Sequence, residues 1–227
     1  MSRQIILDTE TTGFDYDKGD RIVEIGCIEM IDREITDNHF HVYINPERPM
    51  PIEAFNVHGL GDEFLKDKPL FAEVGQSFLD YIDGAELIIH NAGFDVPFLN
   101  YELAQVGLPP VTDRSEVIDT LKMAREIYPS QRNTLDALCR RLNVDNSGRE
   151  LHGALLDSEL LAQVYLNMTG GQESFFDAFE SPLNSALANN SNDPSQQKVN
   201  NRPKGRICYA SAEELEIHNA FIEKFNH

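Results

Sequence analysis

Two acidic residues end the first apolar segment of the chain. Asp8 and Glu10 follow Ile5-Ile6-Leu7, a short apolar run typical of a buried strand. Residues two apart in a strand face the same side, so both carboxylates would lie on one face beside an apolar core. Burial and mutual repulsion make that arrangement unfavourable, and a divalent cation would relieve both. For this stretch alone, an ordinary strand end with solvated acids remains the alternative.

Two later acids occupy comparable positions. Asp95 follows a short buried strand and a turn, and Asp157 lies shortly after His152. Each is expected in the first turn of a helix, at an element end that faces a cleft. Four convergent carboxylates are about what two hard divalent ions require. Two such ions can stabilise the attacking and leaving oxygens of a phosphoryl transfer.

Histidine and hydroxyl side chains complete this set. His152 has a side chain suited to take a proton from a metal-bound water, although a lone histidine can also simply cap the following helix. Its place beside Asp157 favours the role of base. His90 borders the same site, and its strand position favours a structural role. Thr11 and Thr12 supply hydroxyls on a flexible turn that a phosphate could approach.

The elements that must position these residues follow from periodicity. Strands over 22–31 and 35–45 after the first strand predict an antiparallel meander. Strands and helices then alternate, which predicts a mixed sheet flanked by helices. The expected later elements are a helix over 70–82, a strand over 87–90, a helix over 95–106, a strand over 117–119, a helix ending at 128, a helix capped by Asn133 and a helix over 153–168 that Gly170 and Gly171 end.

Three regions are expected along the chain: a compact domain over 1–171, a flexible linker over 172–210 and a short helix over 211–227. Residues 189–201 are Asn, Ser, Gln and Pro with almost no apolar side chains, which is typical of a linker. Ser211 begins a capping-box pattern before an amphipathic segment. A lone helix of that length is marginal in water, so we expect it to fold on a partner.

Composition limits the class of protein. The 227 residues carry a formal net charge of −19, which argues against tight duplex binding driven by phosphate neutralisation. Bound metal ions would add local positive charge that this count omits. Cys27, Cys139 and Cys208 lie far apart, so neither a zinc site nor a disulfide framework is expected. The chain has no signal-peptide pattern and no apolar run long enough to span a bilayer, so a cytoplasmic location is expected.

Three segments carry a resemblance to a known family. Asp-Thr-Glu-Thr-Thr-Gly at 8–13, His-Asn-Ala-Gly-Phe-Asp at 90–95 and His-Gly-Ala-Leu-Leu-Asp at 152–157 resemble the three exonuclease motifs of the DEDD family, histidine subtype. Residues 3–172, including 57–60 and 133–138, are most similar to the proofreading epsilon family of bacterial DNA polymerase III. The resemblance implies an RNase H-like α/β fold and 3′→5′ exonuclease activity that depends on two divalent ions, Mg²⁺ or Mn²⁺.

The resemblance also implies roles for individual residues. His152 would be the general base, and the metal ligands would be Asp8, Glu10, Asp95 and Asp157. The residues expected to hold the terminal nucleotide are Thr11, Thr12, His58, Asn91 and Phe94. Phe94 could pack on the sugar or base, where stacking is tolerant of sequence, or could be a core residue beside Asp95. His58 could equally be an ordinary loop residue.

The expected partners come from the same resemblance. The substrate would be a single-stranded or frayed DNA 3′ end, and the C-terminal segment would tether the chain to the polymerase alpha subunit. Residues from Gln172 to Phe176 resemble the short clamp-binding peptides of replication proteins, in which a Gln precedes adjacent hydrophobic anchors. A theta-like subunit is a further expected partner where the organism has one.

Three other functions fit parts of the sequence. A superfamily exoribonuclease would share the core motifs, although the linker and terminal helix favour tethering to a polymerase. A stabilising subunit with a vestigial site would not need all five predicted catalytic residues, which are intact. An acidic metal-binding protein without hydrolysis would not need His152.

Overall fold

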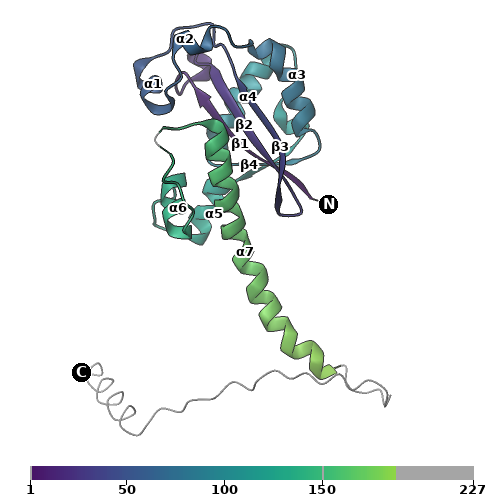
Figure 1. The fold of residues 1–227 in the computed structure, drawn as a ribbon. Coiled ribbons are helices and arrows are strands. Elements are labelled where there is room, and N and C mark those ends of the chain that lie inside the picture. The colour runs from purple at the N-terminus through teal and green to yellow at the C-terminus, as the bar shows by residue number, and fades with distance from the viewer. Residues whose placement is uncertain (1, 150, 188–227) are drawn as a thin grey trace, which may run out of the picture. The chain divides into compact units, whose positions relative to one another are not determined.

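The computed structural model describes residues 2–149 and 151–187, with side chains up to Gly170 (Figure 1). Its contacts divide the chain into one unit over Met1–Glu180 and a second over Ser181–His227. The predicted terminal helix over 211–227 lies outside the described residues, as does the predicted linker beyond 187. The functional division at residue 171 therefore stays a prediction.

The described residues form a mixed five-stranded sheet in the order β3-β2-β1-β4-β5. The pairs β1–β2 and β2–β3 are antiparallel, whereas β1–β4 and β4–β5 are parallel. The meander and the parallel strands expected from the sequence are thus confirmed. The strands are β1 (Arg3–Thr11), β2 (Ile22–Ile31), β3 (Glu34–Tyr43), β4 (Glu86–Ile89) and β5 (Glu116–Asp119).

Helices cover both faces of this sheet. A search of the described helices for an apolar stretch of membrane-spanning length found none. The α-helices are α1 (Ile52–His58), α2 (Asp62–Leu65), α3 (Phe71–Ile82), α4 (Ala92–Gln105), α5 (Thr120–Ile127), α6 (Leu135–Leu142) and α7 (Ala154–Leu187), and the 3-10 turns are η1 (Tyr16–Lys18) and η2 (Val111–Asp113).

Some element boundaries differ from the sequence-based expectation. The segment 52–65 forms α1 and α2, which are too short to show a periodic stripe. Thr134, not Asn133, caps α6 through a hydrogen bond from the Ala137 amide (3.4 Å). The predicted helix end at Gly170 and Gly171 is also wrong, because α7 continues to Leu187. A glycine inside a helix costs only about 1 kcal/mol, which good helix formers around it can offset.

Successive side chains of β1 point to opposite faces of the sheet and pack in two different hydrophobic clusters. Ile5 and Leu7 pack in the cluster that contains Phe78 of α3 and Phe98 of α4. Ile6 points to the opposite face, where it packs with residues of α7 such as Leu161. Figure 1 shows α7 on one side of the sheet and α3 and α4 on the other. Since Asp8 and Glu10 share the parity of Ile6, they face the side that α7 covers.

A close approach between β2 and α7 fixes the position of that helix. Gly26 pairs with Asp8 across the sheet, and a Cβ on Gly26 would lie 2.3 Å from backbone atoms of Ala154 and Leu155. The Ser158 hydroxyl donates a hydrogen bond to the Gly26 carbonyl oxygen (2.9 Å). The absence of a side chain at Gly26 therefore allows the first turn of α7 to lie directly beside the strand that pairs with Asp8.

Candidate active site

One pocket of about 1400 Å³ gathers the predicted site residues. It lies where the C-terminal end of β1 meets the first turns of α4 and α7. All ten predicted residues line it: Asp8, Glu10, Thr11, Thr12, His58, Asn91, Phe94, Asp95, His152 and Asp157. Residues that are distant in the sequence are therefore assembled around one cavity.

The two β1 acids carry strongly perturbed pKa values. Burial raises the pKa of Asp8 well above its ordinary value, and the neighbouring Asp95 and Glu10 carboxylates raise it further. Burial raises the pKa of Glu10 to about 8, with Asp157 adding to the effect. Burial is the larger cause of both shifts, and the neighbouring carboxylates add to it, so the charged forms of these two acids are disfavoured.

Asp95 lies in the first turn of α4 and is buried. Asn91 precedes this helix in a left-handed conformation (φ 69°), which turns the chain sharply after β4. The Thr9 hydroxyl donates a hydrogen bond to Asp95 Oδ1 (2.7 Å). Burial raises the pKa of Asp95 to about 7, although the Thr9 hydrogen bond opposes the shift. Sequence analysis missed Thr9. Strand alternation places its side chain on the face opposite to Asp8 and Glu10, which is the face that α4 covers.

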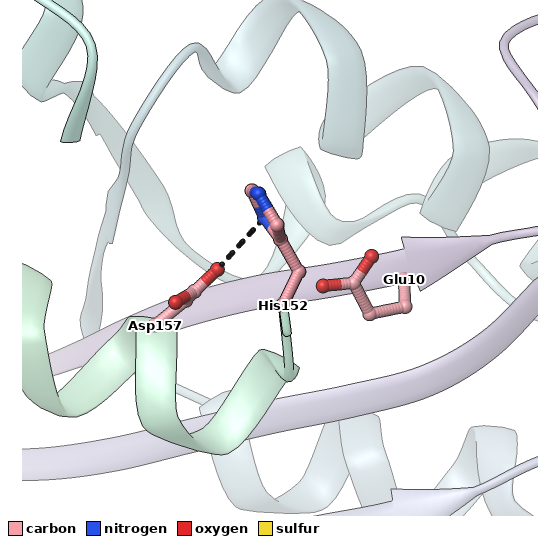
Figure 2. A group of neighbouring side chains, drawn as sticks. All are labelled: Glu10, His152 and Asp157. Atoms are coloured by element: carbon pink, nitrogen blue, oxygen red, sulfur yellow. Dashed lines mark ion pairs between the residues drawn. The ribbon is translucent and has the colours of Figure 1, made fainter. Parts of the chain in front are cut away.

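His152 and Asp157 meet at the start of α7. His152 Nδ1 lies 3.3 Å from Asp157 Oδ2, and the two residues face Glu10 across a short gap (Figure 2). Ligand atoms of Glu10, His152 and Asp157 all lie within 4.8 Å of one another. The His152 amide donates to the Val57 carbonyl oxygen of α1 (3.0 Å), which anchors the segment before α7.

Arg149 is a second residue that sequence analysis missed. Its Nε and Nη2 donate to the two carboxylate oxygens of Asp157, each at 2.5 Å. Its Nη1 donates to Asp136 Oδ1 of α6 (2.6 Å). Burial alone would raise the pKa of Asp157, but the hydrogen bonds from His152 and Arg149 hold it below its ordinary value. No sequence pattern indicated Arg149, because its partners are set by the fold.

The hydroxyls of Thr11 and Thr12, at the end of β1, form hydrogen bonds within the loop that follows. The Thr11 hydroxyl donates to the Gly13 carbonyl oxygen (2.6 Å). The Thr12 hydroxyl accepts from the Arg21 amide (3.0 Å) and lies 3.3 Å from Asp20 Oδ1. Both side chains line the pocket, but their hydrogen bonds indicate that they also hold the loop in shape.

His58 is buried at the end of α1. Its Nδ1 accepts from the Leu60 amide (3.0 Å), so Nε2 carries the proton in the neutral ring. Within the described residues, no partner with hydrogen-bond geometry meets Nε2. Burial lowers the pKa of His58 and favours this neutral form. The backbone of Thr11 lies near the ring and opposes this shift, so His58 contacts the end of β1, and its role in holding the nucleotide stays a prediction.

Aromatic and histidine side chains form the remaining wall. Phe94 packs against the core residue Phe98 (ring centroids 5.1 Å apart) and also lines the pocket, so its core role is confirmed and its contact with the nucleotide stays a prediction. Phe14 lies 6.2 Å from Phe94 in an edge-on arrangement and is 83% exposed, and sequence analysis did not single it out. His90 Nδ1 lies 3.0 Å from the Thr120 hydroxyl oxygen, in agreement with the structural role expected for it.

The donor set fits a hard divalent cation. Oxygen ligands dominate, with one imidazole beside them and no sulfur. The raised pKa values of Asp8, Glu10 and Asp95 show that a cation would relieve unfavourable charge here. By contrast, Cys27 and Cys139 are free, buried thiols in separate core clusters.

Comparisons with known proteins agree with the site. The family model described as Exonuclease matches residues 5–165. The epsilon subunit of DNA polymerase III from Rickettsia prowazekii is 50% identical over 98% of this chain and 96% of its own length. The epsilon subunit from Pasteurella multocida is 58% identical over 79% of this chain and 73% of its own length.

A solved structure gives the same result for the fold. Exonuclease X in complex with 5′-overhanging duplex DNA is 26% identical, with a TM-score of 0.57 over 74% of this chain and 92% of that one. The RNase H-like fold and the exonuclease function expected from the sequence are confirmed by these matches. The chain belongs to the exonuclease family and, within it, to the epsilon subunits of DNA polymerase III.

Proposed function

We propose that this chain is a two-metal 3′→5′ exodeoxyribonuclease that proofreads DNA synthesis within a replicative polymerase. The observation that carries the proposal is the convergence of four carboxylates and His152 on one pocket. A mismatched 3′ end supplies single strand at less cost than a paired end, so fraying would provide selectivity.

The reaction would be hydrolysis of the last phosphodiester. Water adds to phosphorus, the bond from phosphorus to the 3′ oxygen breaks, and a nucleoside 5′-monophosphate leaves. Asp8, Glu10, Asp95 and Asp157 would hold two divalent ions, which supply charge stabilisation of the attacking and leaving oxygens. His152 would take the proton of the attacking water. In the tautomer whose Nδ1–H donates to Asp157 Oδ2 (3.3 Å), Nε2 is unprotonated and would accept this proton.

The terminal nucleotide would lie between the aromatic wall and His58. The exposed Phe14 ring and the neighbouring Phe94 ring offer a stacking surface that does not discriminate between bases. His58 lines the same pocket and would donate from Nε2 to the nucleotide. Asn91 is an exposed polar side chain on the same pocket and would add a hydrogen bond. Such contacts hold any base, as proofreading requires.

A group of exposed arginines on the pocket edge would receive the rest of the strand. We call this group the arginine rim, and it consists of Arg125, Arg132 and Arg140 of the α5–α6 region. A chain with a net charge of −19 repels DNA as a whole, so local cations beside the site would be needed to guide phosphates into it. The rim borders the pocket, where it would hold the phosphates next to the strand end.

The proposed partners are those of a polymerase subunit. Residues 211–227 would bind the alpha subunit, Gln172 to Phe176 would contact the sliding clamp, and a theta-like subunit would bind the nuclease domain where one exists. The Rickettsia relative matches 98% of this chain, so the likeness extends into the C-terminal region. Truncation after Gly171 should keep hydrolysis and lose polymerase binding, and co-elution of truncated protein with the polymerase would contradict the tether.

A cleavage ladder tests the reaction itself. Purified full-length protein with Mg²⁺ or Mn²⁺ would receive 5′-labelled single strands of DNA or RNA, with His152→Ala as the control. Shortening of DNA from the 3′ end, lost in the control, is the expected result. Preferred shortening of RNA would instead identify an exoribonuclease. Cleavage of neither strand would refute the enzymatic proposal and favour a stabilising subunit.

A further inference from the structure

Arg149 forms a buried ion pair at the centre of the site. Its side chain is only 8% exposed, and its partner Asp157 is 4% exposed. The guanidinium engages both Asp157 oxygens at 2.5 Å and approaches His152 Nδ1 at 2.8 Å. Among the ion pairs of the described residues, no other Lys or Arg contacts any of the four site acids. One cation therefore offsets part of the charge that the site acids create.

This pairing competes with the chemistry proposed for the site. Asp157 offers a carboxylate oxygen to a cluster of ligand atoms, shared with Glu10 and His152, that all lie within 4.8 Å of one another. Both of its oxygens are instead hydrogen-bonded to one guanidinium. A divalent ion at this cluster would lie close to the guanidinium charge of Arg149, which is itself only 8% exposed, so the two cations would repel each other.

Asp136 gives Arg149 a second position. Arg149 Nη1 donates to Asp136 Oδ1 (2.6 Å), and Asp136 lies in the first turn of α6 on the pocket edge. Asp136 is about half exposed, and its ion pair with Arg149 uses Nη1, whereas Nε and Nη2 bind Asp157. The guanidinium therefore has a second carboxylate partner whose contact does not depend on Asp157.

We propose that the Arg149 guanidinium pairs with Asp157 in the metal-free protein and that a divalent ion displaces it from this carboxylate when the ion binds. The inference rests on the proposed metal site. Arg149 is a positioning residue: it holds both oxygens of Asp157 in place before metal arrives, and it lowers the affinity of the site for the ion. A permanent brace for Asp157 would have the opposite effect, because removing a brace would weaken metal binding.

The opposite signs of these two effects allow a direct test. Mn²⁺ binding to the full-length protein without DNA would be measured by titration calorimetry, and melting temperature would be measured in EDTA and in saturating Mn²⁺. The variants are Arg149→Gln and Arg149→Lys. The matched control is Arg3→Gln, since Arg3 also pairs with a buried carboxylate, Glu29 (2.7 Å), but does not line the pocket.

We expect Arg149→Gln to melt lower than wild type in EDTA and to bind Mn²⁺ at least about tenfold more tightly, because a unit positive charge has left the site. Its gain in melting temperature on adding Mn²⁺ should exceed that of wild type. Arg149→Lys keeps the charge but cannot engage both oxygens, so its affinity should be intermediate. Arg3→Gln should lower the melting temperature equally in EDTA and Mn²⁺ and leave Mn²⁺ affinity unchanged.

Equal or weaker Mn²⁺ binding by Arg149→Gln would overturn the inference and identify Arg149 as a brace. If that variant does not fold in EDTA, Arg149→Lys decides the question, because weaker binding than wild type would again overturn it. Failure of the proposed metal site looks different: wild-type protein itself would then bind no Mn²⁺ and show no gain in melting temperature.

Discussion

Replacing Gly26 by alanine should separate α7 from the sheet and disable the site. An added Cβ would lie 2.3 Å from backbone atoms of Ala154 and Leu155, more than 1 Å short of the ordinary contact distance of 3.4 Å. Backbone on both sides leaves no flexible side chain to yield, so the first turn of α7 must move by about that amount. This turn carries Asp157, and His152 immediately precedes it.

The displacement sets the size of the expected effects. A misplacement of about 1 Å at a catalytic group costs roughly 100-fold in rate, so kcat for nucleotide release should fall about 100-fold. Overpacking of this kind costs about 1–3 kcal/mol of unfolding free energy. For a chain of this size that corresponds to a loss of about 2–12 °C in melting temperature.

Steady-state release of nucleotides from a 5′-labelled oligonucleotide would measure kcat, and calorimetry would measure stability. Gly93→Ala is the matched control, because a Cβ at this position in the first turn of α4 would meet no atom within 4 Å apart from its chain neighbours and the backbone of its own helix. The control should keep its activity and melt at an equal or higher temperature. Wild-type kcat and stability in Gly26→Ala would refute the reasoning, and lost stability with full kcat would show that α7 does not set the catalytic geometry.

Further predictions concern charge, positioning and the strand path. In EDTA the melting temperature should fall as pH rises through about 7 to 8, because the pKa values of Glu10 (about 8) and Asp95 (about 7) are raised and the stability from their protonation is lost there. Saturating Mn²⁺ should remove most of this slope, whereas a flat profile in EDTA would contradict the charge argument. Asp8→Ala should abolish cleavage while the fold persists and should raise the melting temperature in EDTA, since it relieves acid repulsion; retained activity in pure protein would exclude the site assignment. Thr9→Val should lower kcat by roughly tenfold because it removes the hydrogen bond to Asp95, and Thr9→Ser should restore it. Neutralising the arginine rim to Gln should weaken oligonucleotide binding and reduce its salt slope by about 0.7 per lost phosphate contact, with hydrolysis of a mononucleotide ester unchanged; an equal loss on the ester would place the rim in the chemistry itself.

Local patterns in the sequence determined much of this protein. The alternation of β1 was enough to place Asp8 and Glu10 on one face, because side-chain direction in a strand depends only on parity. Turn and helix-start signals placed Asp95 and Asp157 in first helical turns, as the structure confirms. Spacing and motif order then indicated the exonuclease family.

Other features depended on contacts between distant segments. The role of Gly26 arises from the packing of α7 on β2, and nothing in its own neighbourhood of the sequence reveals that approach. Thr9 reaches Asp95 and Arg149 reaches Asp136 only because the end of β1, the starts of α4 and α6 and the loop before α7 meet at the same pocket. Short-range propensity also failed for α1 and α2, which are too brief to produce a periodic signal.

The division has a physical reason. Strand alternation, helix capping and helix periodicity depend on a few neighbouring residues, so the local sequence is enough to predict them. The charge balance of the site is a sum over groups from β1, α4, α6 and α7 at distances that only the folded chain sets. The sequence alone therefore determined which residues could perform the chemistry, and the tertiary structure decided which neighbours hold them in place and what charge they carry.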